Sequence, residues 1–327
     1  MGYLSCEFVE HGMCFIRDAA VLCSYSMCMK FEAIKIIEDY KGELFDWDKI
    51  RQIKQEYRDR FAKGDIPKIC EGCPSLQVKD WNGSMQLAYI LINHWENCQL
   101  DCVYCHTHDQ KKYLNSLKPW KILPVLKDAL DKNMLSYNGN VNITGGEPTI
   151  LKEFPDLMKF FLENTNIFIM INSAAVDYSK WIKKGLEMKR AAVTVSLDAG
   201  CRETYKKVKN VDYFKKVINN IKKYKKGLDP ISASLIGMKY IFIPGYNDTL
   251  EEVQSWLKIV EDLGMTNIQL ELEHHWYEKN KYLPENVKEY IQMVVDYAHE
   301  HKCNLDYREI LTTCGYRDRI RYINNGR

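Results

Sequence analysis

The stretch NCQLDCVYCH, residues 97–106, places three cysteines close together, at Cys98, Cys102 and Cys105. It follows an apolar run, and the cysteines are separated first by three residues and then by two. Zinc sites usually take their thiolates from separated C-x2-C pairs, and a disulfide would leave one of the three thiols over. The pattern therefore favours a soft metal cluster of several atoms in this loop.

From Gln86 onward, short β-branched runs alternate with longer amphipathic segments. Six strands are expected at residues 86–93, 141–144, 167–172, 191–198, 235–243 and 267–273. Six helical segments are expected at 120–133, 154–164, 179–188, 202–226 (broken near 210–212), 249–264 and 286–302. Such alternation indicates parallel strands joined by right-handed crossovers. Six units are too few for the closed eight-stranded barrel, so the sequence predicts an α/β fold with a partial (β/α)6 TIM-like barrel.

A second motif, ITGGEP at residues 143–148, ends the second expected strand. In such sheets the chemistry gathers at the carboxyl ends of the strands, which is where both this motif and the cysteine loop fall. Two glycines let the backbone approach a ligand closely, and the carboxylate of Glu147 can pair with an ammonium group. An ordinary strand-to-helix turn with a capping glutamate would show the same letters, but its conjunction with the cysteine triad favours a binding site.

With these motifs in this order, residues 86–273 resemble the radical S-adenosylmethionine (radical SAM) superfamily. The resemblance implies that Cys98, Cys102 and Cys105 hold a [4Fe–4S] cluster and that SAM chelates the iron left without a cysteine. One electron from the reduced cluster would cleave SAM into methionine and a 5′-deoxyadenosyl radical. That radical would abstract hydrogen from a substrate C–H bond, and a reductant such as flavodoxin or ferredoxin would supply the electron.

The resemblance also implies which residues contact SAM. Tyr104 would lie against the adenine, while Gly145, Gly146 and Glu147 would receive the amino group. The contacts with the ribose or carboxylate would come from the ends of the third and fourth strands, namely Asn172, Ser173, Ser196 and Asp198. Serine and aspartate at strand ends are also ordinary helix caps.

Residues 1–82 lack the alternation of strands and helices and are rich in cysteine, so we expect a small N-terminal domain before a barrel domain at 83–327. One helix is expected at 47–64. The segments around GMCFIRDAAVLCS and GDIPKICEGCPSL resemble the SPASM or twitch auxiliary-cluster module, which normally follows the barrel rather than preceding it. The resemblance implies a second [4Fe–4S] cluster on Cys6, Cys23, Cys70 and Cys73, with Cys14 and Cys28 as alternative ligands. Zinc on the same four thiols is the alternative.

Composition excludes several partners. The chain of 327 residues holds 46 Lys and Arg against 44 Asp and Glu, so a net charge of +2 gives no field that would attract nucleic acid or an anionic membrane. No stretch approaches the ~20 apolar residues needed to span a bilayer, and the N-terminus does not read as a secretory signal. Twelve cysteines without such a signal indicate metal ligation in a cytoplasmic protein rather than disulfides.

Two classes of function remain in view. A non-catalytic iron–sulfur electron carrier would need neither the GGEP turn nor the barrel, and it would supply four cysteines to each cluster, so the triad favours the enzyme. A small-molecule or sugar-type substrate, oxidised or epimerised, is preferred, because the cysteine-rich N-terminus does not look like a domain that binds a leader peptide. Modification of a ribosomal peptide or protein is the alternative. For epimerisation, Cys201 is the expected hydrogen donor and Cys314 its rival, although a cysteine that merely packs against the next helix would look the same.

Overall fold

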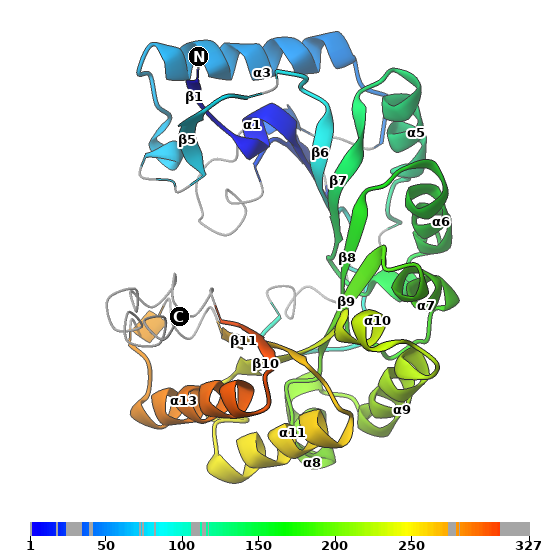
Figure 1. Cartoon of the computed structure of the whole chain (residues 1–327), viewed down its shortest axis with the longest axis vertical. Coiled ribbons are helices and arrows are strands. Elements are labelled where there is room, and N and C mark those ends of the chain that lie inside the picture. The colour runs from blue at the N-terminus through cyan, green and yellow to red at the C-terminus, as the bar shows by residue number, and fades with distance from the viewer. Residues whose placement is uncertain are drawn as a thin grey trace. The chain divides into compact units, whose positions relative to one another are not determined.

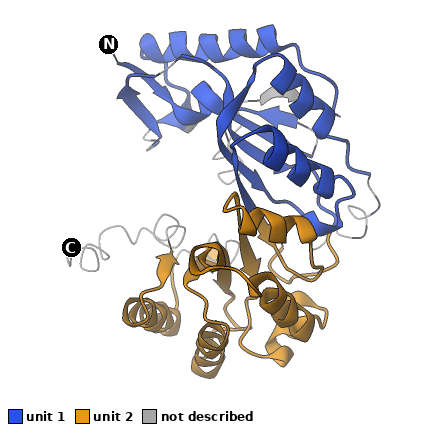
Figure 2. Cartoon of the chain, turned by 45° about the vertical axis from the view of Figure 1, so that its right-hand side comes forward, with its two compact units in different colours: residues 1–97, 115–171 blue, residues 98–114, 172–327 orange. Residues whose placement is uncertain are grey.

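A computed structural model describes residues 2–307 apart from 18, 24–34, 39–41, 72, 74, 82, 106–111, 113–115, 117, 274–278 and 281. The chain forms two compact units (Figure 2). The first comprises residues 1–97 and 115–171, and the second comprises residues 98–114 and 172–327. No helix in the described ranges combines the length and the apolar character needed to cross a membrane.

The sheet of the first unit has the strand order β8-β7-β6-β2-β3-β4. Figure 1 shows β6, β7 and β8 side by side in it. Its strands are β2 (Gly12–Ile16), β3 (Ala19–Val21), β4 (Lys35–Glu38), β6 (Leu87–Asn93), β7 (Leu135–Ile143) and β8 (Phe168–Ser173). The strands β2, β6, β7 and β8 pair in parallel, whereas β3 pairs antiparallel with β2 and β4. A separate antiparallel pair joins β1 (Tyr3–Cys6) to β5 (Leu76–Lys79).

The helices of the first unit bury amphipathic faces. They are α1 (Glu7–His11), α3 (Trp47–Ala62), α5 (Leu123–Asp131) and α6 (Phe154–Asn164), with 3-10 turns η1 (Lys68–Cys70) and η3 (Pro148–Ile150). Asp46 caps α3, because its carboxylate accepts hydrogen bonds from the backbone N–H groups of Asp48 and Lys49. The indole N–H of Trp47 donates to Asp128 on α5 at 2.6 Å, which ties the start of α3 to the helix layer of the sheet.

The second unit is a parallel sheet in the order β9-β10-β11-β12. Its strands are β9 (Ala191–Ser196), β10 (Ile236–Phe242), β11 (Asn267–Leu272) and β12 (Asn304–Asp306). Its helices are α7 (Lys180–Glu187), α8 (Arg202–Lys209), α9 (Phe214–Lys225), α10 (Pro230–Ser234), α11 (Leu250–Asp262) and α13 (Glu285–Glu300). Tyr240 on β10 and Trp256 on α11 are both fully buried with their rings 5.0 Å apart, so α11 covers that face of the sheet.

The fold class predicted from the sequence is confirmed, since the six expected strands are β6 to β11 and the expected helices follow them. The break expected near 210–212 separates α8 from α9, where Asn210 ends α8 with φ of +55°. The compact units divide the chain differently from the boundary expected at 82–83. The reason is that β2, from the cysteine-rich segment, extends the same sheet by pairing with β6 over five residues.

Candidate active site

The cysteine loop, residues 98–105, lies in the second unit after the end of β6. All three cysteines are thiols in no disulfide. The backbone N–H of Leu100 donates to Sγ of Cys98 at 3.4 Å, and the N–H of Cys105 donates to the carbonyl of Cys102 at 3.1 Å. Burial raises the pKa of Cys102. The loop therefore turns tightly around its thiols, all three of which are half-buried.

The C-terminal end of α8 fixes the same loop by hydrogen bonds on both sides of Cys102. The N–H of Asp101 donates to the carbonyl of Lys209 at 3.1 Å, and the N–H of Val103 donates to the carbonyl of Val208 at 2.9 Å. The side-chain amide of Asn210 adds a bond to the carbonyl of Asp101 at 2.8 Å. Because the last carbonyls of a helix have no partner within it, α8 has acceptors to offer, and the loop takes them.

Tyr104 of the loop forms a polar cluster with the buried side chains of Asp198 and Lys209. Nζ of Lys209 lies 2.5 Å from Oδ2 of Asp198 and 2.8 Å from the Tyr104 hydroxyl, and that hydroxyl donates to Oδ2 at 2.7 Å. The side chains of Lys209 and Asp198 are 1% and 0% exposed. Burial alone lowers the pKa of Lys209, but attraction to Asp198 and to the Cys102 thiol outweighs it, so the pKa is raised and the lysine stays charged.

Asp198 was expected to touch SAM, but the structure gives both of its carboxylate oxygens to the protein. Oδ1 accepts from the backbone N–H of Ile241 on β10 at 2.9 Å, while Oδ2 serves Lys209 and Tyr104. Tyr104 also packs with Val103 against the apolar cluster of Val208, Ile241 and Ile243. These contacts make Asp198 and the Tyr104 hydroxyl supports of the cysteine loop, and a contact of either residue with SAM stays a prediction.

The GGEP turn lies in the first unit and packs against the segment that leads into the cysteine loop. The N–H of Gly146 donates to the carbonyl of Trp95 at 3.0 Å, and the N–H of Glu147 donates to that of Asn97 at 2.8 Å. A Cβ at Gly145, which has φ of +114°, would lie 2.5 Å from the Trp95 carbonyl oxygen, and one at Gly146 would lie 2.0 Å from that of Asn97. Only glycine fits at either position.

Glu147 caps the short turn η3. Its Oε1 accepts from the backbone N–H of Thr149 at 3.1 Å and from the Thr149 hydroxyl at 2.6 Å, and the residue is 1% exposed. The capping interpretation of this glutamate is therefore realised in the structure. Its pairing with the amino group of SAM stays a prediction, as do the SAM contacts expected of Gly145 and Gly146.

The other expected SAM contacts end strands β8 and β9. Asn172 is half-buried, and buried Ser173 accepts from the N–H of Ala175 at 2.9 Å. Ser196, also half-buried, lies opposite Lys239 of β10 in the sheet register. Ser173 thus forms a turn with its own backbone but does not cap a helix, because the next helix, α7, has Ser179 as its N-cap. The SAM contacts expected of Asn172, Ser173 and Ser196 stay predictions, and Ser196 also belongs to a second feature of the sheet.

That feature is a polar row across one face of the sheet in the second unit. In register across the four strands lie Ser196, Lys239, Gln269 and Asp306. Lys239 donates to Glu271, the next residue on this face of β11, at 3.1 Å, and both side chains are about 15% exposed. Gln269 also donates to Glu271, at 2.7 Å. Parallel sheets are normally apolar on both faces, so this polar row is a departure from the usual pattern. The sequence does not reveal this row, because its members lie on different strands among β-branched residues and are aligned only by the pairing register of the sheet.

On the same face, toward the strand ends, Ile241 follows Lys239 at the two-residue spacing of a strand. Ile241 and Ile243 contact Val103 and Tyr104 of the cysteine loop. The polar row therefore lies beneath the cysteine loop and on the face of the sheet opposite to α11.

The N-terminal thiols form a second group in the first unit. The pKa of Cys6 is raised to about 11 and that of Cys70 to about 12, chiefly by burial and in smaller part by the neighbouring thiols of Cys23 and Cys73. The mutual influence places the four expected ligands in one neighbourhood. Cys6 and Cys70 belong to one apolar cluster with Val9, Leu22 and Phe61, whereas the alternative ligand Cys14 lies in another with Ala19 and Val21. The other alternative, Cys28, lies outside the described residues.

Cys201 is the N-cap of α8. Its Sγ accepts from the N–H of Thr204 at 3.5 Å and lies 3.5 Å from Oε2 of Glu252 on α11, while Glu252 also accepts from the N–H of Cys201 at 3.3 Å. A Cβ at the neighbouring Gly200 would lie 2.2 Å from the carbonyl of Glu252, so this turn packs tightly on α11. The contacts favour a packing role, and hydrogen donation by Cys201 stays a prediction. Its rival Cys314 lies outside the described residues.

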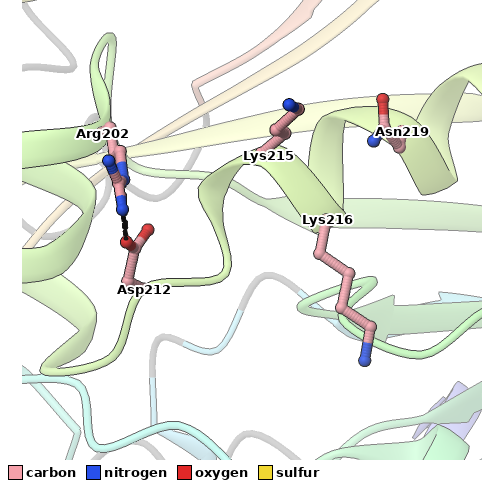
Figure 3. A pocket seen from close by; sticks show the side chains of 5 residues that line it. All are labelled: Arg202, Asp212, Lys215, Lys216 and Asn219. Carbon is pink, nitrogen blue, oxygen red and sulfur yellow. Dashed lines mark hydrogen bonds and ion pairs between the residues drawn. The ribbon is translucent and has the colours of Figure 1, made fainter.

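A pocket of about 610 Å³ in the second unit is lined by Arg202, Asp212, Lys215, Lys216 and Asn219 (Figure 3). Arg202 and Asp212 point toward one another and pair, with Nε and Oδ2 2.7 Å apart. Lys216 pairs with Asp177 at 2.8 Å. The lining contains none of the expected site residues, and three of its charged side chains, Arg202, Asp212 and Lys216, are engaged in ion pairs of the kind common on protein surfaces.

The residues of the cysteine loop fit an iron–sulfur cluster. No three His, Cys, Asp or Glu side chains in the described ranges converge closely enough for a single metal ion, but a cube of four irons holds its thiolates farther apart than one ion does. The side-chain amide of Gln99, between Cys98 and Cys102, has its nitrogen and its oxygen buried without a partner. Buried amides are normally hydrogen-bonded, so this one indicates a polar group that binds beside it.

Comparison with known proteins agrees with this site. The family model of the radical SAM superfamily matches residues 92–257, so the chain belongs to the radical SAM superfamily. Members of that family use a [4Fe–4S] cluster and SAM.

Among curated proteins, the chain is similar to a probable GTP 3′,8-cyclase of Saccharolobus islandicus, with 29% identity over 53% of each chain. It is also similar to one of Methanococcus aeolicus, with 27% identity over 60% of this chain and 65% of that protein. The chain thus spans about half the length of the first of these relatives. Among solved structures, native anSMEcpe with bound AdoMet superposes with a TM-score of 0.50 at 19% identity, covering 67% of this chain and 63% of that one. That likeness concerns the fold.

Proposed function

We propose that the protein oxidises a polar small molecule by abstracting a hydrogen atom, with Cys98, Cys102 and Cys105 as the ligands of its SAM-binding cluster. When bound, the cluster and SAM supply the 5′-deoxyadenosyl radical. The observation that carries the proposal is the cysteine loop, held by α8 and the Asp198–Lys209 pair over the polar row of the sheet. The chain's own task is to hold the thiols, exclude water and orient the substrate.

The polar row supports the choice of substrate class. Ser196, Lys239 and Gln269 offer hydroxyl, ammonium and amide groups on one face, and Glu271 adds a carboxylate beside the lysine. Such a set binds hydroxyl and charged groups by hydrogen bonds, as a sugar or a nucleotide would offer. The curated relatives are named for GTP, which also favours a small molecule.

The N-terminal thiols support oxidation over epimerisation. After losing a hydrogen atom, the substrate must lose one more electron and a proton to become a stable product that is two hydrogens lighter. A second [4Fe–4S] cluster on Cys6, Cys23, Cys70 and Cys73 would take that electron, and a flavodoxin or ferredoxin would exchange electrons with the protein. Epimerisation would instead need a hydrogen donor, and the contacts of Cys201 with Thr204 and Glu252 give that thiol another task.

The test measures 5′-deoxyadenosine formed from SAM under dithionite by the reconstituted protein. Wild type should form it, and the triple replacement of Cys98, Cys102 and Cys105 by Ala should abolish it. Undiminished formation by the triple variant would reject these ligands.

The substrate class is tested by adding cell extract divided by size into a small-molecule fraction and a peptide fraction. The small-molecule fraction should raise 5′-deoxyadenosine formation above the basal rate, and digestion with protease should not reduce the effect. Stimulation by the peptide fraction alone, lost on protease treatment, would replace this proposal with peptide modification.

A further inference from the structure

The geometry points to two roles for the buried pair of Asp198 and Lys209. The pair holds the cysteine loop in position, and its two opposite charges set the reduction potential of the cluster that this loop would bind. The inference rests on the ligation by Cys98, Cys102 and Cys105 proposed above. It concerns residues that do not ligate the cluster and acts through the loop and through charge.

The mechanical part follows from where the pair is anchored. Asp198 stands at φ of +54°, a conformation that short polar side chains tolerate better than most, and its carbonyl accepts from the amide of Asn247 at 3.0 Å. Its Oδ1 is fixed by the N–H of Ile241. Lys209 is the last residue of α8, and its carbonyl receives the N–H of Asp101. One pair thus joins two strands, a helix end and the cysteine loop.

The electrostatic part follows from burial. With the side chains of Lys209 and Asp198 hidden from solvent, neither charge is screened by water or salt as a surface charge would be. Lys209 also contacts two residues of the loop that each stand directly before a cysteine. Its Nζ lies 2.8 Å from the hydroxyl of Tyr104, and its carbonyl accepts from the N–H of Asp101. A reduced cluster carries one more negative charge than the oxidised one, so a nearby cation raises the potential and a nearby carboxylate lowers it.

Substitutions of the two residues should therefore shift the midpoint potential of the cluster in opposite directions. Replacing Lys209 by Gln leaves the carboxylate uncompensated and should lower the midpoint potential. Replacing Asp198 by Asn leaves the ammonium uncompensated and should raise it. The double variant carries neither charge and should return close to the wild-type value. Mere damage to the loop has no reason to reverse sign between the two single variants.

The experiment is a potentiometric titration of the reconstituted full chain, followed by the EPR signal that changes when SAM is added. Iron content is measured first. Lys207→Gln is the matched control, because Lys207 is an exposed cation on the same helix, and its removal should leave the midpoint potential unchanged. Opposite shifts in Lys209→Gln and Asp198→Asn, both larger than in the control, support the inference.

Shifts of the same sign, or no shift beyond that of the control, overturn it. If the single variants lose their iron, the double variant decides: a potential equal to that of wild type supports the balance of charges, and a displaced one rejects it. Wild type without iron would overturn the ligation in the proposed function, and this inference with it. Wild type with iron, and variants with unmoved potentials, would overturn this inference alone.

Discussion

The carbonyl oxygen of Asn97 accepts a hydrogen bond from the backbone N–H of Glu147 at 2.8 Å. The residue directly before the first cysteine of the triad is therefore attached to the GGEP turn. Gly145, the first residue of that turn, stands 47 positions after Cys98 in the chain. The segment 95–97 nevertheless passes so close to the turn that neither Gly145 nor Gly146 has room for a Cβ atom. Backbone proximity, rather than side-chain chemistry, explains the two glycines.

Gly146→Ala should destabilise the protein. The added Cβ would lie 2.0 Å from the Asn97 carbonyl, a backbone atom that cannot move without shifting the entry to the cysteine loop. We expect a loss of about 1–3 kcal/mol in the free energy of unfolding, as for other overpacked sites, together with reduced iron loading. Chemical denaturation and iron analysis measure both.

Gly237→Ala is the matched control, because its Cβ would meet only ordinary contacts, the nearest being the Thr194 hydroxyl at 3.6 Å. It should change the free energy of unfolding by less than about 1 kcal/mol. Equal stability of the Gly146 and Gly237 variants would contradict the close approach of the two segments.

His94 should make stability fall at acidic pH. Burial lowers its pKa to about 4, and it is 1% exposed, with Nε2 3.0 Å from the Trp120 carbonyl and Nδ1 buried without a partner. Between the ordinary value of about 6.5 and about 4, the unfolded chain binds a proton that the folded chain does not. The stability contributed by neutral His94 is therefore present above pH 6.5 and is lost as the pH falls toward 4, by at most about 3 kcal/mol.

The measurement is the free energy of unfolding from pH 7 to pH 5 in wild type and His94→Leu. The variant should be less stable at pH 7 but should lose less on acidification. His299→Leu, at an exposed position of α13, should keep the wild-type slope. A His94→Leu profile as steep as that of wild type would show that other groups produce the acid sensitivity.

The sequence predicted those strands correctly in which the periodicity of apolar residues matches the alternation of buried and exposed side chains. In β9 the letters AAVTVS alternate between buried and half-buried, which the period of two already predicts. It did not find β2, β3 and the β1–β5 pair, because short strands among cysteines and charges carry no periodic signal, and their partners are distant in sequence. It missed the polar row because Ser196, Lys239 and Gln269 are brought together only by the sheet register.

The expected site residues divide in the same way. Cys98, Cys102 and Cys105 lie within one short loop, so their grouping could be predicted from the sequence alone. Lys209, eleven residues beyond Asp198, gave no signal, because a lysine in a lysine-rich helix reads as solvated surface. Its burial becomes apparent only once α8 and the cysteine loop are seen to meet.

Turnover in deuterated water should separate oxidation from epimerisation once the small-molecule fraction has yielded a substrate. We expect a product two hydrogens lighter, with no deuterium at the reacting carbon. Cys201→Ser is the decisive variant, because serine keeps the N-cap of α8 but its O–H bond is too strong to give a hydrogen atom to a carbon radical. The variant should therefore form the same product as wild type. Deuterium that is incorporated by wild type and lost in Cys201→Ser would instead establish epimerisation with Cys201 as donor.

Iron stoichiometry should distinguish the two groups of thiols. If each holds a four-iron cube, anaerobically reconstituted wild type contains about eight irons per chain. Replacing Cys98, Cys102 and Cys105 by Ala, or replacing Cys70 and Cys73 by Ala, should each leave about four. Cys303→Ala is the control, because this half-buried thiol lies 3.6 Å from the Met265 carbonyl and belongs to neither group, so about eight irons should remain. About four irons and one zinc in wild type, with zinc lost in the Cys70 and Cys73 variant, would assign the N-terminal thiols to zinc and remove the electron acceptor from the proposed oxidation.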